Sequence, residues 1–137
     1  MVDISVTATG VLASGQASVE TGIAGVALTA GMLVYKEAAT GRFKGTDCDD
    51  ATVEKRSIYG IALNGAAIGQ PVSVAKSDPD FTPGATLTKG SRYYASGVAG
   101  AIAPEADLAS GDHVALLGVA SSTTKLVMQP FNSGVVI

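Results

Sequence analysis

Residues 58–75 read IYGIALNGAAIGQPVSVA and predict two β-strands joined by a turn. Apolar and β-branched residues fill both ends of the stretch, as half-buried strands require. Asn64 and Gly65 suit a turn with positive φ angles, and Gly69 is a second permissive point. Pro71 has no N–H to donate, so the second strand starts there or lies at a sheet edge. No side chain of the stretch is an evident nucleophile, base or metal ligand.

The same kind of pattern continues on both sides of this hairpin. Short apolar runs, separated by segments rich in Gly, Pro, Ser and Asp, occur at residues 32–35, 85–94, 113–120 and 125–128. Residues 77–84 (SDPDFTPG) look like a turn-rich bridge. No long window carries a capped helical stripe. Short strands at this spacing predict an all-β fold, a compact β-sandwich or barrel of short antiparallel strands.

Two parts of the sequence repeat in the same order. Residues 28–35 (LTAGMLVY) align with 87–94 (LTKGSRYY) at an offset of 59, and residues 59–63 (YGIAL) align with 117–121 (LGVAS) at an offset of 58. Chains rich in Gly and Ala also produce chance matches. A shared order with nearly equal spacing nevertheless favours a duplicated β unit, in which each copy covers the apolar face that the other cannot bury alone.

The length of 137 residues suits one compact domain with a sizeable core. Residues 1–22 are rich in Gly, Ala, Ser and Thr, and Val2, Ile4 and Val6 would share one face of an extended segment. Such a segment is either a frayed terminus or an arm that adds a strand to a neighbouring subunit. We expect an extended N-terminal arm at 1–22 and a β-rich domain at 23–137, with pseudo-repeats at about 24–76 and 83–129.

Charge and cysteine content exclude several classes of protein. The net charge is -3, only 15% of residues are charged, and Lys and Arg are scattered, so we expect no nucleic-acid partner. Cys48 is the single cysteine, so no internal disulfide can form. No apolar run approaches membrane-spanning length, and the N-terminus lacks a signal-peptide pattern, so we expect no membrane partner and synthesis in the cytoplasm.

The densest acidic cluster is Asp47-Cys48-Asp49-Asp50. A calcium loop needs about six oxygen ligands at set positions, and Glu54 has the wrong spacing to close one. A solvated loop is therefore the better interpretation. The three carboxylates also disfavour a reactive Cys48 thiolate.

His113 is the only histidine and lies between Asp112 and a strand, with Ser110 nearby, which invites a hydrolase triad. Triad residues normally come from separated chain positions, and no G-x-S-x-G motif occurs. We therefore expect a structural histidine. Nucleotide-binding and zinc motifs are absent as well, so no cofactor is expected.

An ordered set of turn and strand motifs carries a family resemblance. It comprises Ala30-Gly31, Val34-Tyr35, GIALN at 60–64, GQPV at 69–72, Gly84, Gly90, Tyr93-Tyr94, Ile102-Ala103-Pro104, Ser110-Gly111-Asp112 and LGVA at 117–120. Over roughly residues 23–130 the chain resembles small virion proteins of tailed bacteriophages, the capsid decoration (cement) proteins, with related modules in head fibres. The segment before residue 23 is not well matched.

The resemblance implies a structural protein without enzymatic activity on the exterior of an icosahedral virion head. Its partners would be the major capsid protein and further copies of itself, as a homotrimer. For contact with the coat or a neighbouring subunit we single out Val2, Ile4, Val6, Val135, Val136 and Ile137. The alternatives are the base module of a head fibre or tail spike and, in another class, a small hydrolase using His113. A chain of 137 residues leaves no room for a fibrous shaft, which favours the decoration protein.

Overall fold

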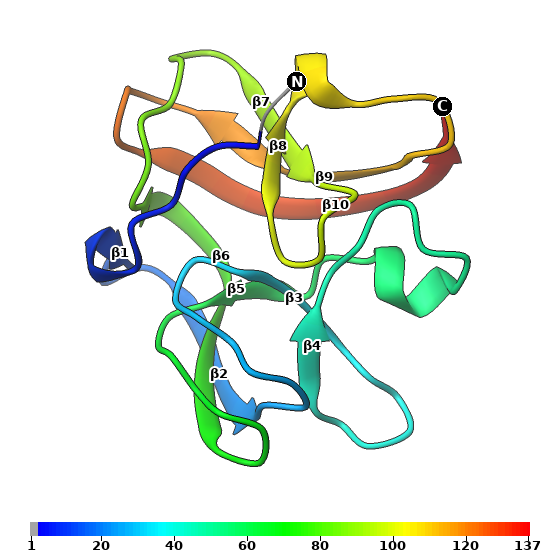
Figure 1. Ribbon diagram of the computed structural model, residues 1–137. Helices are drawn as coiled ribbons and strands as arrows, with labels where there is room; N and C mark the ends of the chain where they lie inside the picture. The colour runs from blue at the N-terminus through cyan, green and yellow to red at the C-terminus, as the bar shows by residue number, and fades with distance from the viewer. Residues whose placement is uncertain (1–2) are drawn as a thin grey trace.

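The computed structural model describes residues 3–137, and these residues form an all-β fold without an α-helix (Figure 1). The strands are β1 (Val11–Leu12), β2 (Ser18–Ile23), β3 (Leu33–Lys36), β4 (Phe43–Gly45), β5 (Gly60–Ala62), β6 (Pro71–Pro83), β7 (Arg92–Ala95), β8 (Ile102–Pro104), β9 (His113–Ala120) and β10 (Leu126–Val136). Three short 3-10 turns are η1 (Ala8–Gly10), η2 (Val53–Arg56) and η3 (Glu105–Asp107). The strand pairs are antiparallel and the sheet curls, which confirms the predicted all-β class.

The long strand β6 joins the two halves of the molecule. The strand order is β4-β3-β5-β6-β10-β9-β7-β8, and β1 and β2 also pair with β6. Figure 1 shows β6 running from the lower group of strands into the upper layer that contains β7 to β10. We call β2 to β5 with the beginning of β6 the first unit, and the rest of β6 with β7 to β10 the second unit.

The turn expected at residues 77–84 is wrong, because most of this segment is the second part of β6. Phe81 pairs with Leu126 and Asp78 pairs with Met128, so two residues of β6 stand opposite Val127 alone. Pro79 lies in this bulge, where the ladder does not require its missing N–H. A proline that normally ends a strand is accommodated here by an irregularity in the pairing.

The strand pairings of the two units match residue by residue. Corresponding pairs are Val34–Gly60 with Tyr93–Gly118, Tyr35–Lys44 with Tyr94–Ala103, and Ala62–Val74 with Ala120–Leu126. The turns before β3 and β7 also correspond. Gly31 and Gly90 both have positive φ, and each donates its N–H over 2.8 Å to the last residue of a strand, Ala62 or Ala120. The two aligned sequence segments therefore occupy equivalent positions in the fold.

The buried apolar side chains form two clusters. The larger cluster contains the fully buried Phe81 and includes residues from both units. The smaller cluster surrounds Phe43 inside the first unit. There Glu20, from β2, accepts a hydrogen bond from Tyr59 Oη at 2.7 Å and forms an ion pair with Lys36 at 2.9 Å. These polar groups cover the Phe43–Tyr59 ring pair, whose centroids lie 5.6 Å apart.

The segment predicted as an N-terminal arm is attached to its own chain. Residues 11–12 and 18–23 are strands β1 and β2, both paired with β6. Upstream of them, the Ile4 N–H donates to Ile102 over 3.0 Å and the Thr7 N–H donates to Gly84 over 2.8 Å. The boundary expected at residue 22 thus falls inside β2, because the strand pairs with β6 through residue 23.

Candidate functional site

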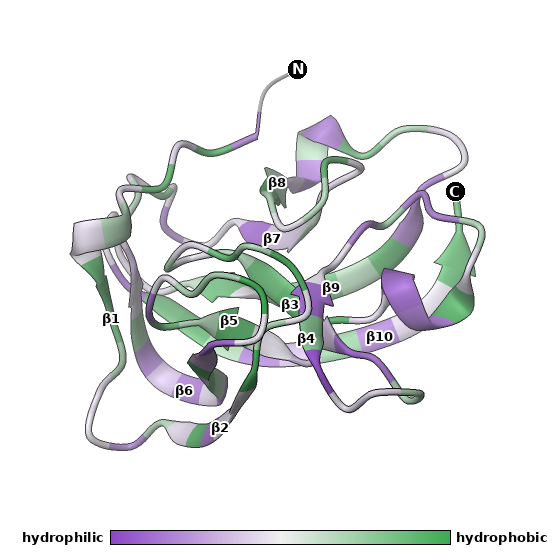
Figure 2. Ribbon diagram, turned by 60° about the horizontal axis from the view of Figure 1, so that its bottom comes forward, coloured by the Kyte–Doolittle hydropathy of each residue, from purple (hydrophilic) through white to green (hydrophobic). Residues whose placement is uncertain are grey.

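The distal part of β10 carries a group of exposed apolar side chains. Phe131, Val135, Val136 and Ile137 are 52–63% exposed, and Val53 of η2 is 69% exposed. Val53 and Gly134 of β10 line the same small cavity, so η2 lies beside this end of the strand. We call Val53, Phe131, Val135, Val136 and Ile137 the C-terminal patch. Figure 2 shows the hydrophobic colour at the end of β10 beside the C-terminus.

The distal part of β10 is paired with a strand on one side. Phe131, Asn132 and Val136 pair with Leu116, Ala115 and His113 of β9. On the β6 side, pairing is confined to Leu126 and Met128. Beyond this point the Asn132 side-chain amide accepts from the Ile58 N–H at 2.8 Å and donates to the Ile58 carbonyl at 3.1 Å. Within residues 3–137, no second strand covers this part of β10.

The six predicted contact residues fall into three groups. Val135, Val136 and Ile137 are exposed in the C-terminal patch. Val2 lies outside the described residues. Ile4 and Val6 are only partly exposed and pack against the larger core cluster of their own chain. Ile4 and Val6 are therefore engaged by their own chain, whereas the three C-terminal residues remain exposed.

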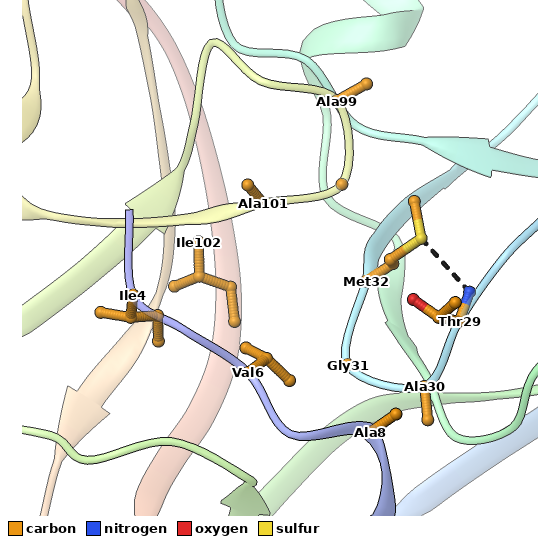
Figure 3. Close-up of a pocket in the computed structure, with 11 residues that line it drawn as sticks. Ile4, Val6, Ala8, Thr29, Ala30, Gly31, Met32, Ala99, Ala101 and Ile102 are labelled. Carbon is orange, nitrogen blue, oxygen red and sulfur yellow. Dashed lines mark hydrogen bonds between the residues drawn. The ribbon is translucent and has the colours of Figure 1, made fainter. Parts of the chain in front are cut away.

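Ile4 and Val6 form one wall of an apolar groove of about 330 Å³ (Figure 3). The opposite wall comes from the turn before β3, including Met32, and from residues 99–101 before β8. Figure 3 shows the Ile4, Val6 and Ile102 side chains on the same side of the groove. A Cβ added at Gly31 would lie 2.4 Å from a Val6 methyl carbon, so the N-terminal segment packs closely here.

His113 is held between two groups that differ from those of a triad. Its Nδ1 lies 3.1 Å from the Cys48 carbonyl oxygen, and its Nε2 contacts the Arg56 guanidinium. A carbonyl only accepts and a guanidinium only donates, so the ring fits as the neutral tautomer with the proton on Nδ1. Neither of these contacts involves the hydroxyl of Ser110. His113 thereby ties the acidic loop and η2 to the start of β9.

The acidic loop does not form a metal centre or a reactive thiol. Within residues 3–137, no three His, Cys, Asp or Glu side chains are placed to hold a metal ion together. Cys48 is fully buried, and burial, with the nearby Asp112 carboxylate, raises the pKa of its thiol to about 12. A thiol with that pKa carries almost no thiolate at neutral pH.

We expect Asp47→Asn to stabilise the protein by about 1 kcal/mol at pH 8, allowing for the partial exposure of the site. Burial, followed by the carboxylates of Asp49 and Asp50, raises the pKa of Asp47 to about 6. A pKa above the unfolded value means that the ionised form is disfavoured in the fold, so wild-type stability falls as the pH rises through about 6. Urea unfolding at pH 4 and pH 8 measures the effect.

Most of the gain from Asp47→Asn should be lost at pH 4, where Asp47 is protonated in the folded protein. Asp3→Asn, outside the loop, is the matched control and should not reproduce this pH dependence. An equal gain at both pH values would show that the amide acts through packing or hydrogen bonding and not through charge.

Two members of the C-terminal patch, Phe131 and Val53, were not anticipated from the sequence. The signal that points to Phe131 is the absence of charge, since residues 126–137 contain no Asp, Glu, Lys or Arg. Edge strands of monomeric proteins usually carry such charges, which discourage pairing with other chains. No local sequence pattern points to Val53, because its position beside β10 depends on the path of the loop between β4 and β5.

No helix within residues 3–137 has the length and hydropathy needed to cross a membrane. Neither a protein family nor a curated protein matches the sequence.

Proposed function

We propose that this chain is a structural virion protein that binds the outer surface of an icosahedral phage head and stabilises the capsid, acting as a homotrimer. The observation that carries the proposal is the C-terminal patch, an apolar and uncharged strand end on a small all-β scaffold. Large exposed apolar patches on small proteins mark surfaces that other macromolecules cover. The family resemblance over residues 23–130 indicates that the assembly is an icosahedral phage head.

A protein of this kind stabilises a shell by mass action. It binds the assembled coat lattice and not the separated subunits, so its binding free energy adds to the stability of the assembled form. Lattice symmetry repeats each contact many times, and a trimer engages several coat subunits at once, which raises the effective affinity without a large interface. A rigid scaffold suits this role because little conformational entropy is lost on binding.

The proposal is tested by adding the purified chain to expanded phage heads that lack it and separating free from bound protein by sedimentation. We expect saturable binding at a fixed number of copies per head, together with a higher temperature of head disruption. Heads that already carry their full complement are the control and should take up no labelled protein. Absence of binding, with no corresponding density in a cryo-EM map of the parent particle, would contradict the proposal.

Removing residues 1–20 is a natural test of an N-terminal arm, but in this fold it is not a clean experiment on head binding. The truncation deletes β1 and half of β2, together with the core contacts of Ile4 and Val6. It would unfold the domain and abolish binding for that reason alone. Single substitutions at exposed positions avoid this loss of the fold.

A further inference from the structure

We infer that the C-terminal patch is the surface through which copies of this chain associate with one another. The number of copies, three, is taken from the proposed function, and only this part of the inference rests on it. Association itself is argued from the contacts of β10 and from the chemistry of the patch.

The two units of the fold show that the distal part of β10 lacks a neighbour. The equivalent part of β6 is flanked by two strands, since Phe81 pairs with β10 and Thr82 and Pro83 pair with β1. The distal part of β10 has β9 alone among the described residues. No second strand of its own chain therefore covers this part of β10, and its exposed apolar side chains are accessible to another copy of the chain.

The chemistry of the patch matches a second copy of itself. No charged side chain occurs from residue 126 to residue 137, so these strand ends from several copies can meet at a symmetry axis without like-charge repulsion between side chains. Arg56 and His113, which line the cavity beside Val53 and Gly134, contact each other. The apolar side chains, each more than half exposed, offer at most about 500 Å² per copy, so a contact that covered all of them would reach the ~1,000 Å² that specific interfaces require.

A second copy would also cover an apolar surface that otherwise favours aggregation. An apolar strand edge without charge leads to aggregation if it stays uncovered. Before the protein meets a head, the one partner that is always present is another copy of the same chain. A closed oligomer with the patches at its axis covers the edge and leaves other faces for the coat.

The experiment is sedimentation equilibrium of the full chain and of single variants. Wild type should sediment at three times the 13.6 kDa chain mass. Phe131→Lys should sediment as a monomer, with the dissociation constant raised at least a hundredfold, because each interface would then bury an unpaired ammonium. Ile68→Lys is the matched control, since Ile68 is 67% exposed before β6 in the first unit, and this variant should assemble like wild type.

Thermal unfolding shows whether each variant is folded, and Val136→Lys replaces Phe131→Lys if the latter is not. A monomeric wild type, or a folded patch variant that assembles normally, overturns the inference. The head-binding assay separates it from the proposed function. A monomer that still binds heads keeps the proposed head binding but removes the inference and the homotrimer. An oligomer that depends on Phe131 but does not bind heads keeps the inference and removes the proposed head binding.

Discussion

Replacing Gly118 with alanine is expected to lower the free energy of unfolding by about 3 kcal/mol or more. Gly118 lies in the middle of β9 and is buried. A Cβ built on it would lie 2.1 Å from the Val127 carbonyl oxygen and 3.0 Å from the Val127 carbonyl carbon. These atoms belong to the backbone of the partner strand, so the clash can be relieved only by moving β9 or β10.

Gly60 occupies the equivalent position in the first unit and predicts the same outcome. Its Cβ would lie 2.3 Å from the Ala75 carbonyl oxygen. Each glycine lies on the strand that pairs with the long strand of its unit, since β5 pairs with β6 and β9 pairs with β10. Glycine inside a strand usually weakens it, so two equivalent glycines here indicate that the close approach of the backbones requires them.

Urea unfolding of Gly118→Ala and Gly60→Ala, followed by circular dichroism, measures the effect. Gly15→Ala is the matched control, because the turn at Gly15 has no atom within 4 Å of an added Cβ. Alanine there should change stability by no more than about 1 kcal/mol, and in the stabilising direction if it has any effect. A Gly118→Ala protein as stable as wild type would mean that the strands separate more easily than their packing indicates.

The sequence alone predicts the fold class because its signals are local. The alternation in residues 58–75, the glycine turns and the spacing of apolar runs each depend on a few neighbouring residues. Gly60 and Gly118 also fall within the aligned segments, so the alignment by itself makes them equivalent. The strand pairs that correspond between the two units follow from these same signals.

Prediction from the sequence fails where a distant segment determines the local structure. Residues 77–84 have turn composition, yet pairing with β1 and β10 holds them in a strand. The N-terminal segment has the composition of a loose arm, yet hydrogen bonds to Ile102 and Gly84 fix it. For the candidate site, Val135 to Ile137 are predictable from hydropathy. Phe131 follows only once β10 is known to continue past Pro130, and Val53 only from the path of the chain.

Asp78→Ala is expected to destabilise the protein by about 3 kcal/mol at pH 7. Asp78 is fully buried in β6 at the junction of the two units. Its carboxylate accepts the Ser14 N–H at 2.6 Å, the Ser14 hydroxyl, and the Asp80 N–H at 2.9 Å. Alanine would leave these donors without an acceptor and would release the loop between β1 and β2 from the junction.

The pH dependence of stability distinguishes the contribution of the Asp78 charge from the contribution of its side-chain shape. Burial acts to raise the pKa of Asp78, but the hydrogen bonds from Ser14 and Asp80 outweigh it and hold the pKa below its usual range. Because the folded pKa is depressed, the carboxylate stabilises the fold at pH values above the unfolded pKa of about 4. This contribution is lost as the pH falls through the folded pKa. Asp78→Asn keeps the shape, so its stability should depend less on pH below about 4 than that of wild type.

Ser14→Ala removes one partner of the carboxylate and should lower the free energy of unfolding by about 1–2 kcal/mol. Combined with Asp78→Ala, it should add little, because both substitutions break the same contact. Thermal unfolding of the two single variants and the double variant completes this cycle. Strictly additive losses would show that Ser14 and Asp78 stabilise the chain independently, and the junction of the two units would then not depend on the N-terminal segment.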